Sequence, residues 1–167
     1  MILETKRMIL RQLTMDDVDN LLLIFRDPIA MEHYPSTKDV AETKSWIQWN
    51  LNLYANNGYG LWAAIDKKSG EFLGQVGLTP QEVEQVIEIE IGYLFVRKFW
   101  GKRFATEGAL ACREYGFHEL NRNRLISLPD PLNLASRRVA EKIGMVLEKE
   151  VTKWNKQVLV YAVHKDY

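Results

Sequence analysis

The chain has 167 residues, of which 47% are hydrophobic and 26% charged, and 22 basic residues balance 22 acidic ones. This composition is typical of a soluble cytoplasmic protein with a single domain over 1–167. The neutral net charge argues against a nucleic-acid partner, which is usually bound through an excess of basic residues. No apolar run reaches the about 18 residues of a membrane span and the first residues do not form a secretory signal, so no membrane association is expected.

Periodicity in the first half predicts a strand, two helices and a hairpin. The strand is expected at 9–13, the first helix between Thr14 and Asp27, and the second at about 39–56. Strands at 60–65 and 71–77 are predicted to pair across the turn 67–70.

The second half begins with the clearest strand, 86–96, where polar and apolar residues alternate. After it we expect a helix at 105–118, a strand at 124–128, a helix at 134–143 that Gly144 ends, and strands at 146–151 and 158–163. This order predicts an α/β fold in which helices cover one sheet.

A basic loop joins the alternating strand to the helix that begins near Ala105. It runs from Arg97 through Lys98, Gly101 and Lys102 to Arg103. A helix N-terminus offers unpaired backbone N–H groups and a positive dipole end, and a glycine lets the backbone approach an anion. The residues alone therefore indicate either a phosphate or pyrophosphate site or a basic helix start on the surface.

Two stretches resemble motifs of the GNAT superfamily of N-acetyltransferases, in the branch with the ribosomal-protein N-terminal (alanine/serine) acetyltransferases. The first is Glu90 to Tyr93 followed by Lys98 to Glu107, and the second is Asp130 to Met145. The stretches Arg7 to Arg11 and Asp27 to Met31 also match, so the resemblance spans nearly the whole chain. It implies the acyl-CoA N-acyltransferase fold, with a mixed, mostly antiparallel central sheet flanked by helices.

The resemblance implies an acyltransferase that moves an acetyl group from acetyl-CoA directly to a primary amine. The acceptor would be a protein N-terminus or a small amine such as a polyamine, amino acid or antibiotic. The family also suggests a homodimer. The three histidines lack metal-ligand spacing, so no metal is expected. A non-catalytic acyl-CoA-binding sensor stays open, because Ala140 replaces the tyrosine that some members use as an acid.

The family pattern also assigns cofactor-binding residues. Its pyrophosphate loop corresponds to Lys98, Gly101, Lys102, Arg103, Phe104, Ala105 and Thr106. The backbone of Phe95 and Val96 would pair with the pantetheine arm, and Asn133 would hold pantetheine or substrate. Arg103 stands where the family has glycine or alanine. If that position needs a left-handed backbone, a non-glycine residue costs on the order of 1 kcal/mol, and the Arg103 side chain would compensate by reaching a CoA phosphate.

Amine acetylation requires a base, since a reference α-amine has a pKa of about 8 and lysine about 10.4. Glu88 and Glu90 lie on one face of the alternating strand. Glu90 matches a family position beside the acetyl-CoA cleft and is the first candidate, with Glu88 second; the alternative is a polar outer face. Ser136 is the candidate for hydrogen bonding to the leaving sulfur. Helix capping is the alternative for Ser136 and Asn133.

Overall fold

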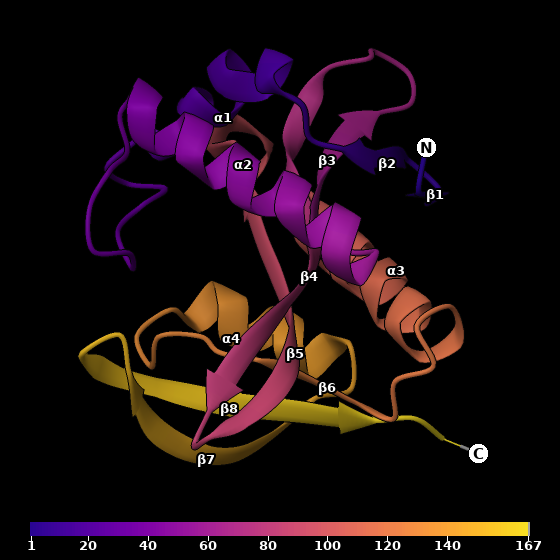
Figure 1. Cartoon of the computed structure of the whole chain (residues 1–167), viewed down its shortest axis with the longest axis vertical. Helices are drawn as coiled ribbons and strands as arrows, with labels where there is room; N and C mark the ends of the chain where they lie inside the picture. The colour runs from indigo at the N-terminus through magenta and orange to yellow at the C-terminus, as the bar shows by residue number, and fades with distance from the viewer. Residues whose placement is uncertain (167) are drawn as a thin grey trace.

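The computed structural model describes residues 1–166 and contains an eight-stranded sheet in the order β1-β2-β3-β4-β5-β6-β8-β7 (Figure 1). The strands are β1 Leu3–Glu4, β2 Met8–Gln12, β3 Leu61–Asp66, β4 Phe72–Val83, β5 Val86–Phe95, β6 Arg124–Ser127, β7 Val146–Lys153 and β8 Lys156–His164. The helices are α1 Val18–Phe25, α2 Val40–Asn57, α3 Phe104–His118 and α4 Leu134–Lys142, with short 3₁₀ turns at Met15–Asp17 and Arg97–Phe99.

Every predicted strand and helix is present, and the predicted α/β class is confirmed. Strand β1 was not predicted, and β4, which was expected to end at 77, runs to Val83. Pro80 and the polar residues around it hide this extension from a hydrophobic pattern. The extension forms because residues 78–83 pair with β5, and the hairpin turns at Glu84 and Gln85, which both have positive φ.

The sheet opens between β5 and β6. Most neighbouring strands are antiparallel, but β5 and β6 run parallel and share one register pair, Glu90 with Ile126. The Ser127 hydroxyl donates to the Ile91 carbonyl at 3.2 Å just past this pair. Beyond Ile91, β5 continues to Phe95 with only β4 as a partner. One sheet therefore contains a wedge-shaped opening at its centre.

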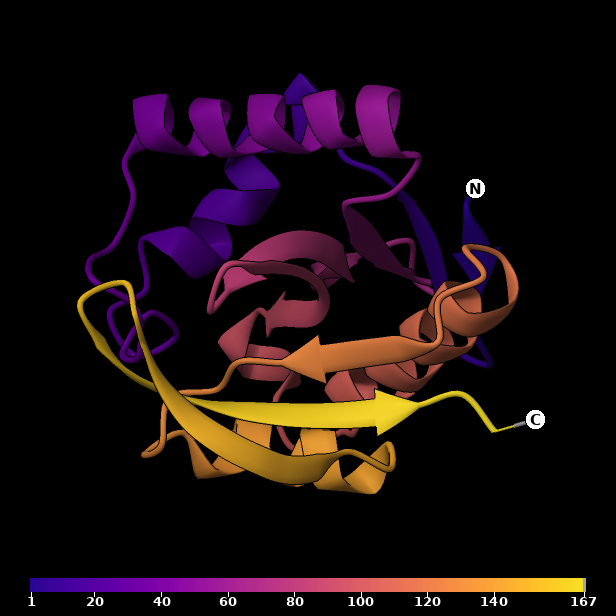
Figure 2. The same cartoon turned by 60° about the horizontal axis from the view of Figure 1, so that its bottom comes forward.

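The helices cover both faces. In Figure 2, α1 and α2 lie above the sheet and α4 lies below it, while α3 packs against β4, β5 and α4. Within 1–166 no helix is long and apolar enough to cross a bilayer. Gly77 allows close strand contact, because a Cβ there would lie 2.1 Å from the Gly60 carbonyl oxygen.

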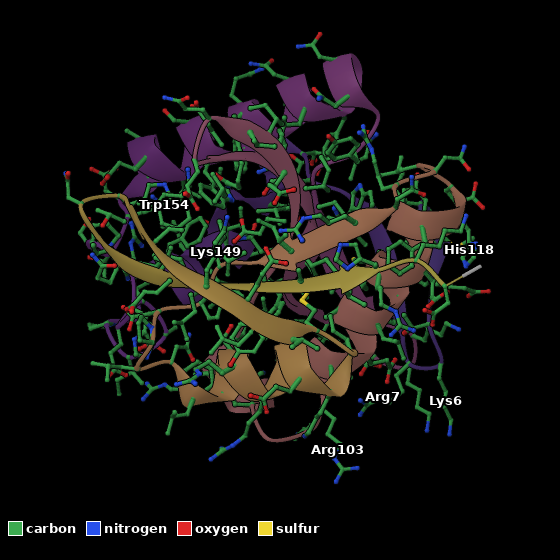
Figure 3. The ribbon with its side chains drawn as sticks, turned by 90° about the horizontal axis from the view of Figure 1, so that it is seen from below. Lys6, Arg7, Arg103, His118, Lys149 and Trp154 are labelled. Carbon is green, nitrogen blue, oxygen red and sulfur yellow. The ribbon has the colours of Figure 1, made fainter. Side chains whose placement is uncertain are left out.

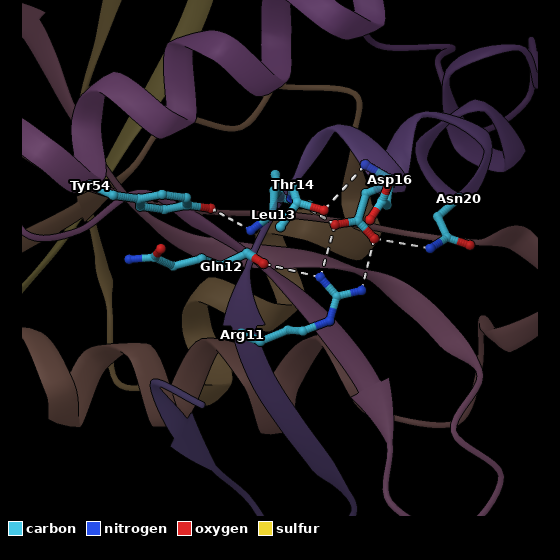
Figure 4. Close-up of polar contacts among 8 residues, drawn as sticks. Arg11, Gln12, Leu13, Thr14, Asp16, Asn20 and Tyr54 are labelled. Carbon is cyan, nitrogen blue, oxygen red and sulfur yellow. Dashed lines mark hydrogen bonds and ion pairs between the residues drawn. The ribbon is translucent and has the colours of Figure 1, made fainter.

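A buried carboxylate fixes the start of α1. Asp17 is 1% exposed and accepts two 2.8 Å hydrogen bonds from the Arg11 guanidinium (Figure 4). It also accepts from the Thr14 backbone N–H and the Asn20 amide. Burial alone would raise the pKa of Asp17, but these donors hold it below its ordinary value. The network ties the end of β2 to the helices beside the opening.

Candidate functional site

A cavity of about 840 Å³ lies where β5 and β6 separate. One wall consists of residues 90–94 of β5 and residues 127–130, where β6 ends and the following loop begins. Asn133 and Ser136 near the start of α4 join it. The opposite wall comes from α1, α2 and the connection between them, including His33, Tyr34 and Pro35. The tip of the β7–β8 hairpin closes one end. Elements from both halves of the chain therefore meet at the opening in the sheet.

Glu90 is the carboxylate at the centre of this lining. Its side chain accepts long hydrogen bonds from Thr79 Oγ1 at 3.4 Å and Gln81 Nε2 at 3.3 Å, and no ion pair engages it among the described residues. Burial raises its pKa from 4.5 to about 7, although those two donors and Lys153 act in the opposite direction. A carboxyl with this pKa exchanges a proton readily at neutral pH.

A hydroxyl pair lies further along the same wall, between β5 and the start of α4. The Tyr93 hydroxyl is 3.0 Å from Ser136 Oγ and 3.2 Å from the Ser136 carbonyl oxygen. Burial first, and then the charge of Glu90, raises the pKa of Tyr93 to about 12. Asn133 is the N-cap of α4 and accepts from the Ser136 backbone N–H at 3.1 Å. Asn133 thus caps the helix and lines the cavity, while the Ser136 hydroxyl remains available to it.

The loop before α3 has two left-handed residues, Gly101 with φ 78° and Arg103 with φ 65°. Arg103 is the N-cap and provides no side-chain cap, so its exposed guanidinium extends from the start of the helix (Figure 3). The first three N–H groups of a helix have no partner within it, and here the bond from the Glu107 N–H to the Arg103 carbonyl begins the ladder. A Cβ at Gly101 would meet open space. The arrangement suits an anion.

Arg7 holds this loop in place. Its guanidinium donates to the Lys102 carbonyl at 2.9 Å and to Glu107 Oε1 at 2.7 Å, and it lies 4.0 Å from the centre of the Phe104 ring. Thr5 also donates to Glu107. These contacts fix the backbone on both sides of Arg103, so the helix start is preorganised by the first hairpin.

Comparison with known proteins decides the family. The model of the acetyltransferase (GNAT) domain matches residues 7–146. The chain is a GNAT acetyltransferase. YkkB of Bacillus subtilis is 48% identical over 139 residues, covering 83% of this chain and 81% of that protein.

Solved structures agree with the family assignment. An acetyltransferase from Agrobacterium tumefaciens has a TM-score of 0.86 at 29% identity and covers 98% of this chain and 94% of its own. The ribosomal-protein acetyltransferase RimL, solved with coenzyme A, has a TM-score of 0.78 at 19% identity, with 98% and 97% covered. At that identity the likeness to RimL shows the fold alone.

Glu88 does not line the acetyltransferase's cavity. Its carboxylate pairs with the Arg124 guanidinium at 2.8 Å, and Arg124 also pairs with Glu148 at 2.7 Å. The two glutamates share a strand face, yet they have separate partners and only Glu90 faces the opening. The structure therefore favours Glu90 over Glu88 as the group that meets a substrate.

Some of the backbone groups predicted to bind pantetheine already have hydrogen-bond partners within the protein. The Val96 N–H donates to the Leu73 carbonyl at 2.9 Å, and the Phe95 carbonyl accepts from the Trp100 indole at 2.9 Å. A carbonyl has two acceptor sites, so Phe95 can take a second donor. Lys98 pairs with Glu71 at 3.1 Å on the outer side of the loop. Its position favours a structural contact over a direct one to an anion at α3.

Several cavity residues were not predicted as site residues. Thr79 and Gln81 stand in the missed half of β4, where their register with Glu90 and Glu88 would have identified them. The Tyr93 side chain, which also lines the cavity, is another. Trp46 and Trp49 of α2 line the cavity as well. Within residues 1–166 no group of three or more His, Cys, Asp or Glu side chains is placed to hold a metal ion.

Proposed function

We propose that this acetyltransferase transfers the acetyl group of acetyl-CoA directly to a primary amine bound at Glu90. The observation that carries the proposal is a half-buried carboxyl, free of an ion pair in the described chain, at the opening between β5 and β6. Its pKa of about 7 suits a group that must accept a proton at neutral pH. The same carboxylate attracts the ammonium form of the substrate before transfer.

The residues around the opening fit acetyl-CoA as the donor. The N-terminus of α3, with Phe104, Ala105 and Thr106 in its first turn, offers N–H groups to a pyrophosphate. Gly101 leaves space for its approach, and Lys102 and Arg103 add positive charge. The pantetheine arm would follow the free side of β5 near Phe95 and Val96 and pass Asn133 to reach the cavity.

The reaction we propose uses groups from β5 and from the start of α4. Glu90, directly or through a water, takes a proton from the ammonium, and the amine nitrogen attacks the thioester carbonyl carbon. Backbone N–H groups near Tyr93 and Leu94 stabilise the oxyanion. The new C–N bond forms as the C–S bond breaks, and the nitrogen releases its second proton to solvent. Ser136, supported by the Tyr93 hydroxyl 3.0 Å away, donates a hydrogen bond to the leaving thiolate.

The test is release of free CoA by the purified protein from acetyl-CoA with a panel of primary amines and N-terminal peptides. We expect amine-dependent release and an acetylated product of the matching mass. Tight acetyl-CoA binding with no release on any acceptor would contradict the proposal and favour the acyl-CoA sensor.

A further inference from the structure

The cavity has one carboxylate available for an amine. Besides Glu90, the acidic residues in its lining are Glu42 and Asp130. The Asp130 carboxylate forms an ion pair with the Lys156 ammonium at 2.6 Å. Glu42 is exposed and accepts from the Asp39 backbone N–H in the capping box of α2. Glu90 is therefore the one carboxylate of these three with neither an ion pair nor a helix-capping role, and it can match one ammonium group on a ligand.

The same lining contains a cation that faces no acid. The Lys38 ammonium lies 5.3 Å from the centre of the Trp46 ring and 5.8 Å from that of Phe25. Within the part of the chain that the structure describes, no ion pair neutralises it. A second positive charge on a substrate would meet Lys38 instead of a carboxylate, and like charges at short range are unfavourable.

The lining also contains several aromatic side chains. Six aromatic residues contribute: Phe25, Tyr34, Trp46, Trp49, Tyr93 and Trp154. The Trp46 ring packs edge-on against Phe25, with 5.6 Å between ring centroids, and lies tilted against Trp49, with 5.2 Å between centroids. Its indole N–H donates to Gln75 Oε1 at 3.0 Å. These contacts hold the rings as a fixed apolar wall that suits a flat apolar group.

The cavity is also restricted at one end. The Lys156 ammonium donates to the His33 carbonyl at 3.1 Å, so the β8 end of the hairpin is tied to the segment between α1 and α2 (Figure 2). Trp154 lies at the tip of that hairpin (Figure 3). A polypeptide leaving the site in this direction would have to displace the contact, whereas a small molecule would not.

Taken together, these features lead us to infer that the acceptor is a small primary amine with one positive charge and an aromatic or similarly flat apolar body. The inference rests on the proposed function and narrows it. It separates the acceptor from polyamines and aminoglycosides, which carry several ammonium groups, and from the N-terminus of a protein.

Matched amines test the inference through kcat/KM for CoA release. Pentylamine and 1,5-diaminopentane differ in one terminal ammonium, and phenethylamine adds a ring. We expect phenethylamine to be the best of the three and 1,5-diaminopentane the poorest. Lys38→Glu should raise the ratio of kcat/KM for 1,5-diaminopentane to kcat/KM for pentylamine by about fivefold. Lys44→Glu, on the exposed side of α2 and outside the lining, should leave the ratio unchanged.

A second variant tests the aromatic wall. Trp49→Leu should lower the ratio of phenethylamine to pentylamine while pentylamine is still acetylated. Preference for 1,5-diaminopentane or spermidine, or for N-terminal peptides over every small amine, would overturn the inference and leave the proposed function standing. Absence of CoA release with every acceptor would refute both.

Discussion

Replacing Glu90 with glutamine changes stability and activity in ways that the cavity predicts. Burial raises the pKa of Glu90 from 4.5 to about 7. The folded protein binds this proton more tightly than the unfolded chain does. The resulting contribution to the free energy of unfolding is fully present below about pH 4.5 and is lost as the pH rises through about 7. A pKa difference of one corresponds to about 1.4 kcal/mol, so ionised Glu90 costs the folded state at most about 3 kcal/mol, less where water enters the cavity.

Glutamine keeps the shape and hydrogen bonding of the side chain and removes this titration. We therefore expect Glu90→Gln to match or exceed the wild type in free energy of unfolding at pH 8, by up to about 3 kcal/mol. The difference between the two proteins should shrink toward pH 5. Urea unfolding at several pH values measures it. A constant difference from pH 5 to pH 8 would show that Glu90 is not held at a raised pKa.

The same variant should lose the base for amine deprotonation. General-base catalysis contributes about 100-fold or more, so kcat/KM should fall by that order at pH 8. The loss should narrow below pH 7, where the wild-type carboxyl is itself protonated. If Glu90→Gln retains kcat/KM within about twofold across this range, Glu90 is not the base, because removing a general base costs far more.

Glu88→Gln is the matched control on the same strand. It removes the ion pair with Arg124, whose other partner Glu148 remains. We expect a stability loss of about 1 kcal/mol, since both side chains keep some contact with water. Its pH profile for kcat/KM should follow the wild type. A larger catalytic loss in Glu88→Gln than in Glu90→Gln would reverse the assignment.

Two further predictions concern the donor side. Tyr93→Phe removes the hydroxyl that lies 3.0 Å from Ser136 Oγ, so we expect kcat to fall about tenfold with little change in the Kd of acetyl-CoA. In the double variant, Ser136→Ala should lower kcat by less than it does alone, because the two hydroxyls act as one unit. An unchanged kcat in Tyr93→Phe would show that the pair takes no part in the reaction. Glycine and asparagine both tolerate the left-handed backbone at position 103 but lack the charge of arginine. Arg103→Gly and Arg103→Asn should therefore each raise the Kd of acetyl-CoA about fivefold, as measured by calorimetry. Binding as tight as in the wild type would show that the Arg103 side chain does not contact a phosphate.

Local patterns in the sequence predicted most of the helices and strands, and they predicted Glu90 as a candidate site residue. Alternation from Val86 to Ile91 placed Glu90 on β5, and the basic loop with its glycine indicated an anion site at α3. The partners of these groups were not visible locally. Tyr93 and Ser136 are 43 residues apart and meet only because α4 lies beside the open edge of β5. Distinguishing Glu90 from Glu88 required the position of Arg124 on β6, which strand periodicity does not give.

Arg103 shows how a departure from a family pattern is accommodated. Its φ of 65° confirms that the position is left-handed, for which a non-glycine residue costs on the order of 1 kcal/mol. Arg7, 95 residues before Lys102, binds the Lys102 carbonyl and stacks on Phe104, so it holds both neighbours of Arg103. Contacts of this kind contribute about 1 kcal/mol each, which is enough to offset the strain. The loop therefore keeps the geometry that glycine would permit and gains a cation where the proposed pyrophosphate would bind.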